Sequence, residues 1–208
     1  SAGRILGTGL AGAGERRGDD YRVMAEVLDD ITTQATNEAG IRKADITTAC
    51  FGISGYDWPS QRQSHLDAIA KIGLDARIEL VNDALLVLHT GSESGSGIAL
   101  IAGTYCNCLG QMQDGRSGRV VGEGHLFGEG AGASELIFQA KHAVAAAWTL
   151  AGPPTMLTEM FISYTGAVDA DEMIEGLVTR RYTLKPDAAP LVFDAAKAGD
   201  HVTYDLVL

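Results

Sequence analysis

The pattern of apolar and polar positions predicts a chain in which helices and strands alternate. Between Asp19 and Ala39 the apolar side chains recur at the spacing of an amphipathic helix, and Gly40 is suited to end it. The next segments, read in the same way, are a strand at 46–53, a helix that Pro59 begins and Gly73 ends, a strand at 77–81 and a short helix at 84–89. This order predicts an α/β fold.

A stretch rich in glycine and serine, residues 91–97, predicts the boundary between two lobes. We therefore expect a first lobe at 1–95 and a second lobe at 96–208. The second lobe should open with strands at 98–102, 106–112 and 119–121, with Asp114 and Gly115 in a hairpin turn, and should continue after Gly132 as helices.

Composition and charge narrow the classes of partner. The 208 residues carry 16 Lys and Arg against 27 Asp and Glu, and the resulting net charge of −11 disfavours contact with the phosphates of nucleic acids and of anionic membranes. No apolar run has the roughly twenty residues that a membrane span needs. We expect a cytoplasmic protein that acts on a small molecule and binds neither nucleic acid nor membrane, with a homodimer left open.

Asp83 is the first candidate for a catalytic residue. It follows the strand at 77–81, where open α/β sheets present ligand groups, so its carboxylate could accept the proton of a substrate hydroxyl. The competing interpretation, favoured by spacing alone, is that Asp83 caps the next helix. Asp57 has the same two interpretations, a ligand group or a cap for the helix that begins at Pro59, and spacing again favours the cap.

Two glycine-rich segments are candidate binding loops. Gly103 and Thr104 form a turn between two strands, and its backbone N–H groups could point at phosphate oxygens or simply close a hairpin. The segment 122–132 holds five glycines and two carboxylates, a composition that lets the backbone approach a ligand closely. Its His125 has no partner at metal-ligand spacing, which favours a structural role, and we assign no metal site.

Several short motifs resemble one known family. They are Gly3 to Leu6, Gly52 to Gly55, Asn82 to Ala84, Leu100 to Thr104 with Asn107 and Cys108, and then Gly122, Gly124, His125 and Gly128. With this spacing the chain is similar to the N-acetylglucosamine kinase branch of the BadF/BadG/BcrA/BcrD ATPase family. The resemblance implies a ribonuclease H-like, actin/hexokinase-type fold with two lobes.

The resemblance also implies roles for individual residues. Asp83 corresponds to the catalytic base, and Gly103 with Thr104 to a contact to the phosphates of ATP. Gly122, Glu123 and Glu129, which share one segment, correspond to the sugar-binding loop. ATP and Mg²⁺ are the implied cofactors. Both lobes should be incomplete in this chain, since the family's first phosphate hairpin would precede Ser1 and its adenosine site would follow Leu208.

Four positions depart from the family pattern. Tyr105 stands where the phosphate turn has glycine, Glu129 where the loop has aspartate, Glu123 where N-acetylglucosamine kinases have tryptophan, and Glu15 where they have a sugar-contacting asparagine. Three carboxylates near one pocket would favour a protonated amino sugar such as glucosamine. Alternatively, Glu15 and Glu123 point into water and only add to the surface charge.

The predicted function is ATP-dependent phosphorylation of N-acetylglucosamine or a related amino sugar. One alternative is the activator ATPase branch of the same family, which holds an iron–sulfur cluster. Its cysteine pattern is not visible in Cys50, Cys106 and Cys108. The other alternative is a sensor with the same fold that binds a sugar without phosphorylating it, an interpretation that Tyr105 and the altered loop keep open.

Overall fold

The computed structural model describes residues 3–12, 14 and 20–208. The chain divides into two compact units, one formed by Ser1–Ala99 and Leu109–Ser117 and the other by Leu100–Cys108 and Gly118–Leu208. Whether they correspond to the two lobes of a kinase, with a boundary at 95/96, stays a prediction.

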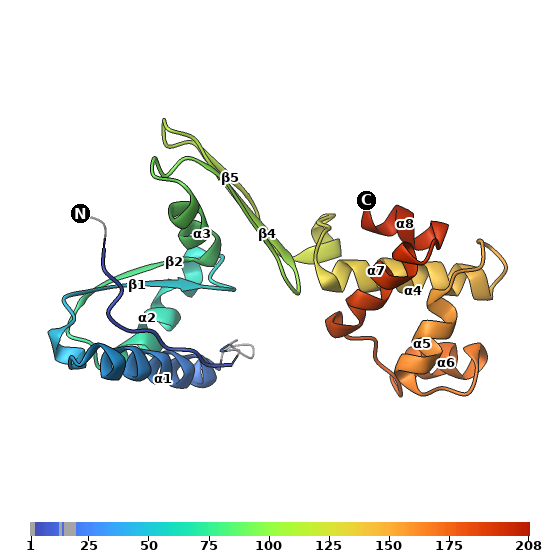
Figure 1. The fold of residues 1–208 in the computed structure, drawn as a ribbon, viewed down its shortest axis with the longest axis horizontal. Coiled ribbons are helices and arrows are strands. Elements are labelled where there is room, and N and C mark those ends of the chain that lie inside the picture. Colours follow the sequence, from blue (N-terminus) through green and yellow to red (C-terminus); the bar gives the residue numbers. More distant parts are fainter. Residues whose placement is uncertain (1–2, 13, 15–19) are drawn as a thin grey trace. The chain divides into compact units, whose positions relative to one another are not determined.

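The first unit contains a parallel pair of strands packed with helices (Figure 1). Its elements are α1 (Arg22–Ala39), the 3₁₀ helices η1 (Lys43–Asp45) and η2 (Pro59–Gln61), β1 (Thr48–Ile53), α2 (Arg62–Ala70), β2 (Arg77–Asn82) and α3 (Asp83–Gly91). The strands pair in register from Thr48 with Arg77 to Ile53 with Asn82. Because parallel neighbours need a crossover connection, η2 and α2 carry the chain from one strand to the other.

The strands and helices predicted for this unit are confirmed. Helix α1 ends at Gly40, which has a left-handed φ of 68° and donates its N–H to carbonyls of the last turn. The helix predicted from Pro59 to Gly73 divides into η2 and α2, and α2 ends at Ala70. The helix was therefore predicted correctly, but its predicted end, Gly73, lies three residues beyond the observed end of α2.

The first unit buries two neighbouring apolar clusters. One consists of Phe51, Ile69, Ile72 and Leu80, which come from both strands, from α2 and from the residues that follow α2. The other joins α1 to α2 through Met24, Ala25 and Ala68. Leu28 borders both clusters, so the amphipathic face of α1 is what closes this core.

A second sheet has the strand order β3-β4-β5, so strands consecutive in the sequence are neighbours. The strands are β3 (Gly97–Ala102), β4 (Cys106–Gln111) and β5 (Ser117–Val120). The predicted hairpin turn is confirmed: Gly115 has a left-handed φ of 86°, and the N–H of Met112 donates to the carbonyl of Arg116 at 2.8 Å.

After the sheet, helices dominate the second unit, as predicted. They are η3 (Gly124–Phe127), α4 (Ala133–Trp148), α5 (Leu157–Thr165), α6 (Ala170–Val178), η4 (Pro186–Ala188), α7 (Ala189–Lys197) and α8 (His201–Val207). Their core is centred on Leu157, Phe161, Met173 and Val192, which have no exposed surface. Helices α7 and α8 both pack on α4, so the position of α4 is held from its apolar side. Among the described residues no helix has the length and apolar character needed to cross a membrane.

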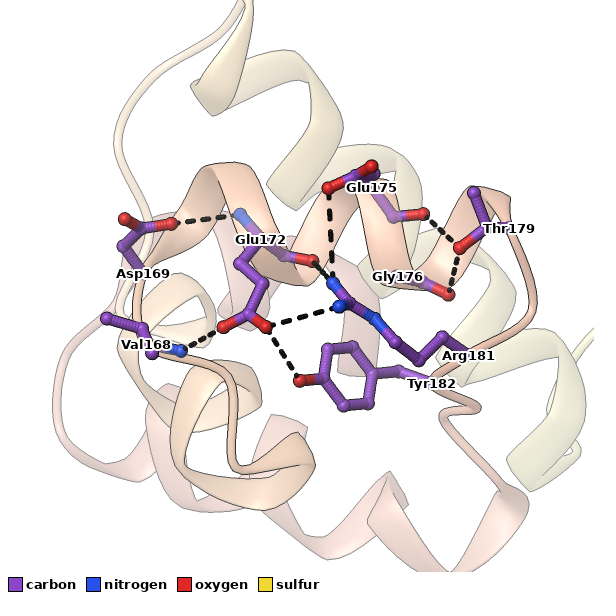
Figure 2. A network of polar contacts seen from close by, with 8 residues as sticks. All are labelled: Val168, Asp169, Glu172, Glu175, Gly176, Thr179, Arg181 and Tyr182. Carbon is purple, nitrogen blue, oxygen red and sulfur yellow. Dashed lines mark hydrogen bonds and ion pairs between the residues drawn. The ribbon is translucent and has the colours of Figure 1, made fainter.

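Figure 2 shows how the ends of α6 are held. The carboxylate of Asp169 caps the helix by accepting the N–H of Glu172 at 2.9 Å. The side chain of Glu172 then pairs with Arg181 at 3.4 Å and accepts the hydroxyl of Tyr182 at 3.3 Å. A Cβ atom added to Gly176 would lie 2.1 Å from the ring of Tyr182, so glycine is needed where the returning chain crosses this helix.

Candidate functional site

In the first unit, polar side chains gather at the carboxyl ends of the parallel strands. The register pairs Ile53 with Asn82, so the two strands end side by side. Asn82 bridges them, because its side-chain amide donates to Oδ1 of Asp57 at 3.1 Å and to the carbonyl of Tyr56 at 3.2 Å. Asp83 follows directly, half-buried, as the first residue of α3. This edge of a parallel sheet is where α/β proteins present ligand groups.

The capping of α3 differs from the prediction by one residue. Asn82, not Asp83, is the N-cap: its backbone is extended (φ −68°, ψ 147°), and its Oδ1 accepts the N–H of Ala84 at 3.0 Å. Oδ1 of Asp83 accepts the same N–H at 2.9 Å. Asp83 therefore lies in the first helical turn, where the helix dipole favours a negative charge.

Asp57 is not a helix cap either. The residue at the N-cap of η2 is Trp58, and no side chain makes a capping hydrogen bond from that position. Instead, Oε1 of Gln61 accepts the N–H groups of Asp57 at 2.9 Å and Trp58 at 3.0 Å. The carboxylate of Asp57 is turned to Asn82, so it belongs to the polar group at the strand ends.

Gly52 explains how Asp83 comes to lie close to β1. A Cβ atom added to Gly52 would lie 2.1 Å from Cδ1 of Leu86 and 3.5 Å from Cα of Asp83. Helix α3 therefore packs directly on the glycine of β1, and a larger residue would push the helix and its first carboxylate away.

In the second unit, the predicted phosphate turn is attached to the start of α4. The N–H groups of Ala133 and Ser134 donate to the carbonyls of Gly103 and Thr104, both at 2.9 Å. The N–H of Gly103 closes the turn on the carbonyl of Tyr105 at 3.0 Å. These bonds satisfy two of the N–H groups that a helix leaves without partners at its start.

Thr104 is left with free donors on the surface of this turn. It is exposed, and within the described part of the chain no hydrogen bond uses its hydroxyl or its N–H. A hydroxyl beside a free backbone N–H can donate to the oxygens of a phosphate group. A cavity of about 310 Å³ opens beside Gly103, between the start of α4 and the last two helices.

The loop 122–132 is closed by one of its own carboxylates. Oε1 of Glu129 accepts the N–H of Val121 at 2.9 Å, and Oε2 accepts those of Glu123 at 2.6 Å and Gly124 at 3.1 Å. The structure therefore brings together Gly122, Glu123 and Glu129, the three residues that the resemblance assigned to the sugar. Glu123 is exposed, whereas both oxygens of Glu129 are engaged by backbone donors.

Sequence reasoning missed a buried carboxylate below this loop. Glu135, in the first turn of α4, is 2% exposed, and neither of its oxygens has a hydrogen-bond partner among the described residues. Gly124 and Gly132 make room for it, since a Cβ atom at either position would lie 2.3 or 2.2 Å from an oxygen of Glu135. A glutamate in the first turn of a helix is an ordinary pattern, so the sequence carried no signal of its burial.

The neighbouring thiol is held in its neutral form. Burial raises the pKa of Cys106, and the negative charges of Cys108, Glu129 and Glu135 raise it further. A thiol in this environment is a poor nucleophile and a poor metal ligand. Within the described residues, no group of three or more His, Cys, Asp or Glu side chains could hold a metal ion.

Two residues considered from the sequence lie outside the described part. Glu15 is not among the described residues, and for His125 only the backbone is described. The assignments made for their side chains remain predictions.

A comparison with protein families identifies the chain. The sequence model of the BadF/BadG/BcrA/BcrD ATPase family matches residues 1–148. The chain belongs to this family. The match includes Asp83, the turn at Gly103 and the whole loop 122–132, so every predicted site residue lies within the part that the family shares.

Two curated relatives are kinases of amino sugars. The chain is 26% identical over 163 residues to the N-acetylmuramic acid/N-acetylglucosamine kinase of Clostridium acetobutylicum, which covers 78% of this chain and 53% of the relative. It is also 26% identical over 203 residues to the N-acetyl-D-glucosamine kinase of Dictyostelium discoideum, which covers 95% of this chain and 62% of the relative. The chain thus spans between about half and three fifths of the length of these relatives.

Solved structures confirm the fold. A crystal structure of a proposed N-acetylglucosamine kinase from Chromobacterium violaceum matches 91% of this chain and 65% of its own with a TM-score of 0.64 and 22% identity. A crystal structure of a proposed N-acetylglucosamine kinase from Porphyromonas gingivalis matches 94% of this chain and 66% of its own, with a TM-score of 0.61 and 18% identity. The predicted α/β fold of sugar kinases is therefore correct for this member of the family.

Proposed function

We propose that the full-length protein is an ATP-dependent kinase that phosphorylates N-acetylglucosamine or a closely related amino sugar in the cytoplasm. The observation that carries this proposal is the position of Asp83. It is a half-buried carboxylate at the carboxyl ends of two parallel strands, in a segment that matches a family of ATPases. The names of both curated relatives support the substrate class.

Asp83 acts as the general base. As the sugar hydroxyl attacks the γ-phosphorus of ATP, the carboxylate takes the hydroxyl proton, which makes the oxygen a better nucleophile. The bond between the γ-phosphorus and the bridging oxygen to the β-phosphate breaks, and ADP leaves. Its place in the first turn of α3 puts the carboxylate beside the positive end of the helix dipole. Asn82 and Gly52 hold this carboxylate in place through the cap and through close packing.

Gly103 and Thr104 bind the phosphates of ATP. The free hydroxyl and N–H of Thr104 suit phosphate oxygens, and the attachment of the turn to α4 keeps these donors rigid. Mg²⁺ bound to ATP would supply positive charge to its phosphates. Gly122 and Glu123 contact the sugar, and Glu129 holds this segment by accepting the N–H groups of Val121, Glu123 and Gly124.

The chemistry of the loop favours N-acetylglucosamine over glucosamine. An acidic pocket for a protonated amine was expected from Glu15, Glu123 and Glu129 together. Glu129 directs both oxygens to backbone N–H groups of its own loop, so its charge is largely compensated there. With that carboxylate engaged, the neutral N-acetyl sugar is the better candidate.

The test is a coupled assay of ATP consumption by the purified full-length protein with N-acetylglucosamine, N-acetylmuramic acid, glucosamine and glucose. We expect the highest kcat/KM with N-acetylglucosamine. A higher kcat/KM with glucosamine would restore the acidic pocket. Absence of turnover with every sugar, while the protein still binds them, would identify a sensor, and absence of both binding and turnover would overturn the proposal.

A further inference from the structure

Tyr105 is a large aromatic residue at a place where the chain turns tightly. It follows Thr104 and immediately precedes β4, which begins at Cys106. The residue is 49% exposed, although its backbone is closely packed. A half-exposed ring at the end of a rigid turn is a feature that the roles proposed above do not use.

Three glycines of the neighbouring loop surround this residue. A Cβ atom at Gly132 would lie 2.6 Å from Cα of Tyr105, and one at Gly124 would lie 3.3 Å from Cδ1 of its ring. A Cβ atom at Gly122 would lie 3.8 Å from Cβ of Tyr105. The backbone of Tyr105 is therefore locked against the end of the loop, and one part of its ring faces the segment that begins the loop.

This arrangement puts the ring between two groups of proposed ligand contacts. Thr104 precedes it in the chain, and Gly122 to Gly124 lie against it. Because the turn is bonded to the start of α4, the ring is held on a rigid support. Rigid, partly exposed aromatic rings give binding sites a large apolar contact area at a small cost in conformational entropy.

We propose that the exposed face of Tyr105 packs against the C–H face of the sugar and is a determinant of sugar affinity. A sugar ring carries hydroxyls on its edge and C–H groups on its faces, so an aromatic ring complements the face while hydrogen-bonding groups read the edge. This inference rests on the proposed function. The inference adds to the proposed function a residue that supplies the apolar contact to the sugar.

A purely structural role for the ring and a contact with the sugar predict different effects of truncating Tyr105. If Tyr105 only covered the buried carboxylate of Glu135, its truncation would lower the thermal stability and leave sugar affinity unchanged. If the ring contacts the sugar, truncation weakens sugar binding by roughly tenfold or more, since a large apolar contact is lost. Binding of ATP would stay within about twofold, because the donors of Thr104 do not depend on the ring.

The experiment measures the sugar Kd by calorimetry and the KM for N-acetylglucosamine and for ATP in the full-length protein. The variants are Tyr105→Phe, Tyr105→Leu and Tyr105→Ala, with Tyr204→Ala, which removes a tyrosine of similar exposure from α8, as the control. We expect Tyr105→Phe and Tyr204→Ala to match the wild type. Tyr105→Leu, which preserves apolar volume without the flat ring, and Tyr105→Ala should each raise the sugar Kd and KM.

Two outcomes would overturn the inference, and they are distinguishable. If the wild type binds and phosphorylates a sugar but Tyr105→Leu has the same sugar Kd, the ring has no role in the sugar site and the proposed function stands. If the wild type binds no sugar of the panel, the proposed function fails and this inference fails with it. Where Tyr105→Ala does not fold, Tyr105→Leu alone decides.

Discussion

At the scale of single residues, the glycines of the loop 122–132 divide into two kinds. The composition predicted that they let the backbone approach a ligand. Gly128 and Gly130 do have open space around the position of a Cβ atom. Gly124 and Gly132 make room for the protein itself, for the carboxylate of Glu135 and the backbone of Tyr105. The sequence does not distinguish these two kinds of glycine, because the atoms that neighbour each glycine are set by the fold.

Gly132→Ala should destabilise the protein, and Gly130→Ala should not. The new methyl group at 132 would overlap the backbone of Tyr105, which cannot move without disturbing the turn, so we expect a loss of roughly 1–3 kcal/mol in the free energy of unfolding. The methyl group at 130 meets open space, and its effect should stay within about 0.5 kcal/mol. Urea denaturation measures both. Equal stability of the two variants would contradict the packing described here.

Ala131→Gly should stabilise the protein. Ala131 has a φ of 69°, in the left-handed region that costs a residue with a Cβ atom roughly 1–2 kcal/mol and costs glycine nothing. Part of this gain is offset by the greater freedom of glycine in the unfolded chain, so we expect a net gain of about 0.5–1 kcal/mol. Urea denaturation again measures it, and a loss of stability would show that the backbone at 131 is not left-handed in solution.

At the scale of elements, the sequence predicted the presence and the type of helices and strands better than their ends. The helix α1 and the strands β1 and β2 lie within three residues of the predicted bounds, because their apolar periods are clear. The start of α3 was harder. Asn82 and Asp83 are adjacent residues that both cap helices well, and only the extended backbone at Asn82 decides between them.

Asn82→Ala should therefore cost about 1–2 kcal/mol of stability. The change removes the cap of α3 and the bridge to Asp57, while Asp83 retains its own contact to the same N–H. Asn82→Asp provides the comparison, since it preserves the capping oxygen but places a second carboxylate beside Asp57. We expect thermal denaturation to rank the wild type above both variants. A melting temperature of Asn82→Ala equal to the wild type would refute the cap.

Asp200 joins the starts of α5 and α8 and should make stability depend on pH. Burial alone would raise the pKa of its carboxyl, but hydrogen bonds from the N–H of Met156, the hydroxyl of Thr155 and the N–H groups of Thr203 and Val202 outweigh burial and lower it. The folded-state pKa thus lies below the unfolded one. The stabilisation that the ionised carboxylate of Asp200 contributes is complete above about pH 4, the pKa in the unfolded chain. It is lost as the pH falls through the pKa in the folded protein.

Asp200→Asn tests this linkage. We expect the variant to be less stable than the wild type at neutral pH, because an amide cannot accept all four bonds, and the difference should shrink in acid. Asp205→Asn, which changes an exposed carboxyl on the same helix, should follow the wild type at every pH. Denaturation midpoints between pH 2 and pH 7 measure the difference. A constant difference across this range would contradict a lowered pKa at Asp200.

At the scale of the whole molecule, the fold class and family could be predicted from the sequence, because the glycine and strand motifs are spaced as in the family. The contacts and the burial of the acidic residues could not be predicted from the sequence. Glu129, which the sequence assigned to the sugar site, also closes its own loop, and Glu135 drew no attention but is buried. Both outcomes depend on which backbone N–H groups the folded loop leaves free, and this information is absent from residue types and spacing.

The central claim, that this family member is a sugar kinase with Asp83 as its base, is tested most directly by Asp83→Asn in the full-length protein. The amide preserves an oxygen for the N–H of Ala84 but cannot take a proton. We predict an unchanged melting temperature, an unchanged Kd for N-acetylglucosamine and a kcat lower by roughly a hundredfold to ten-thousandfold. Unchanged kcat with N-acetylglucosamine and ATP would contradict the account.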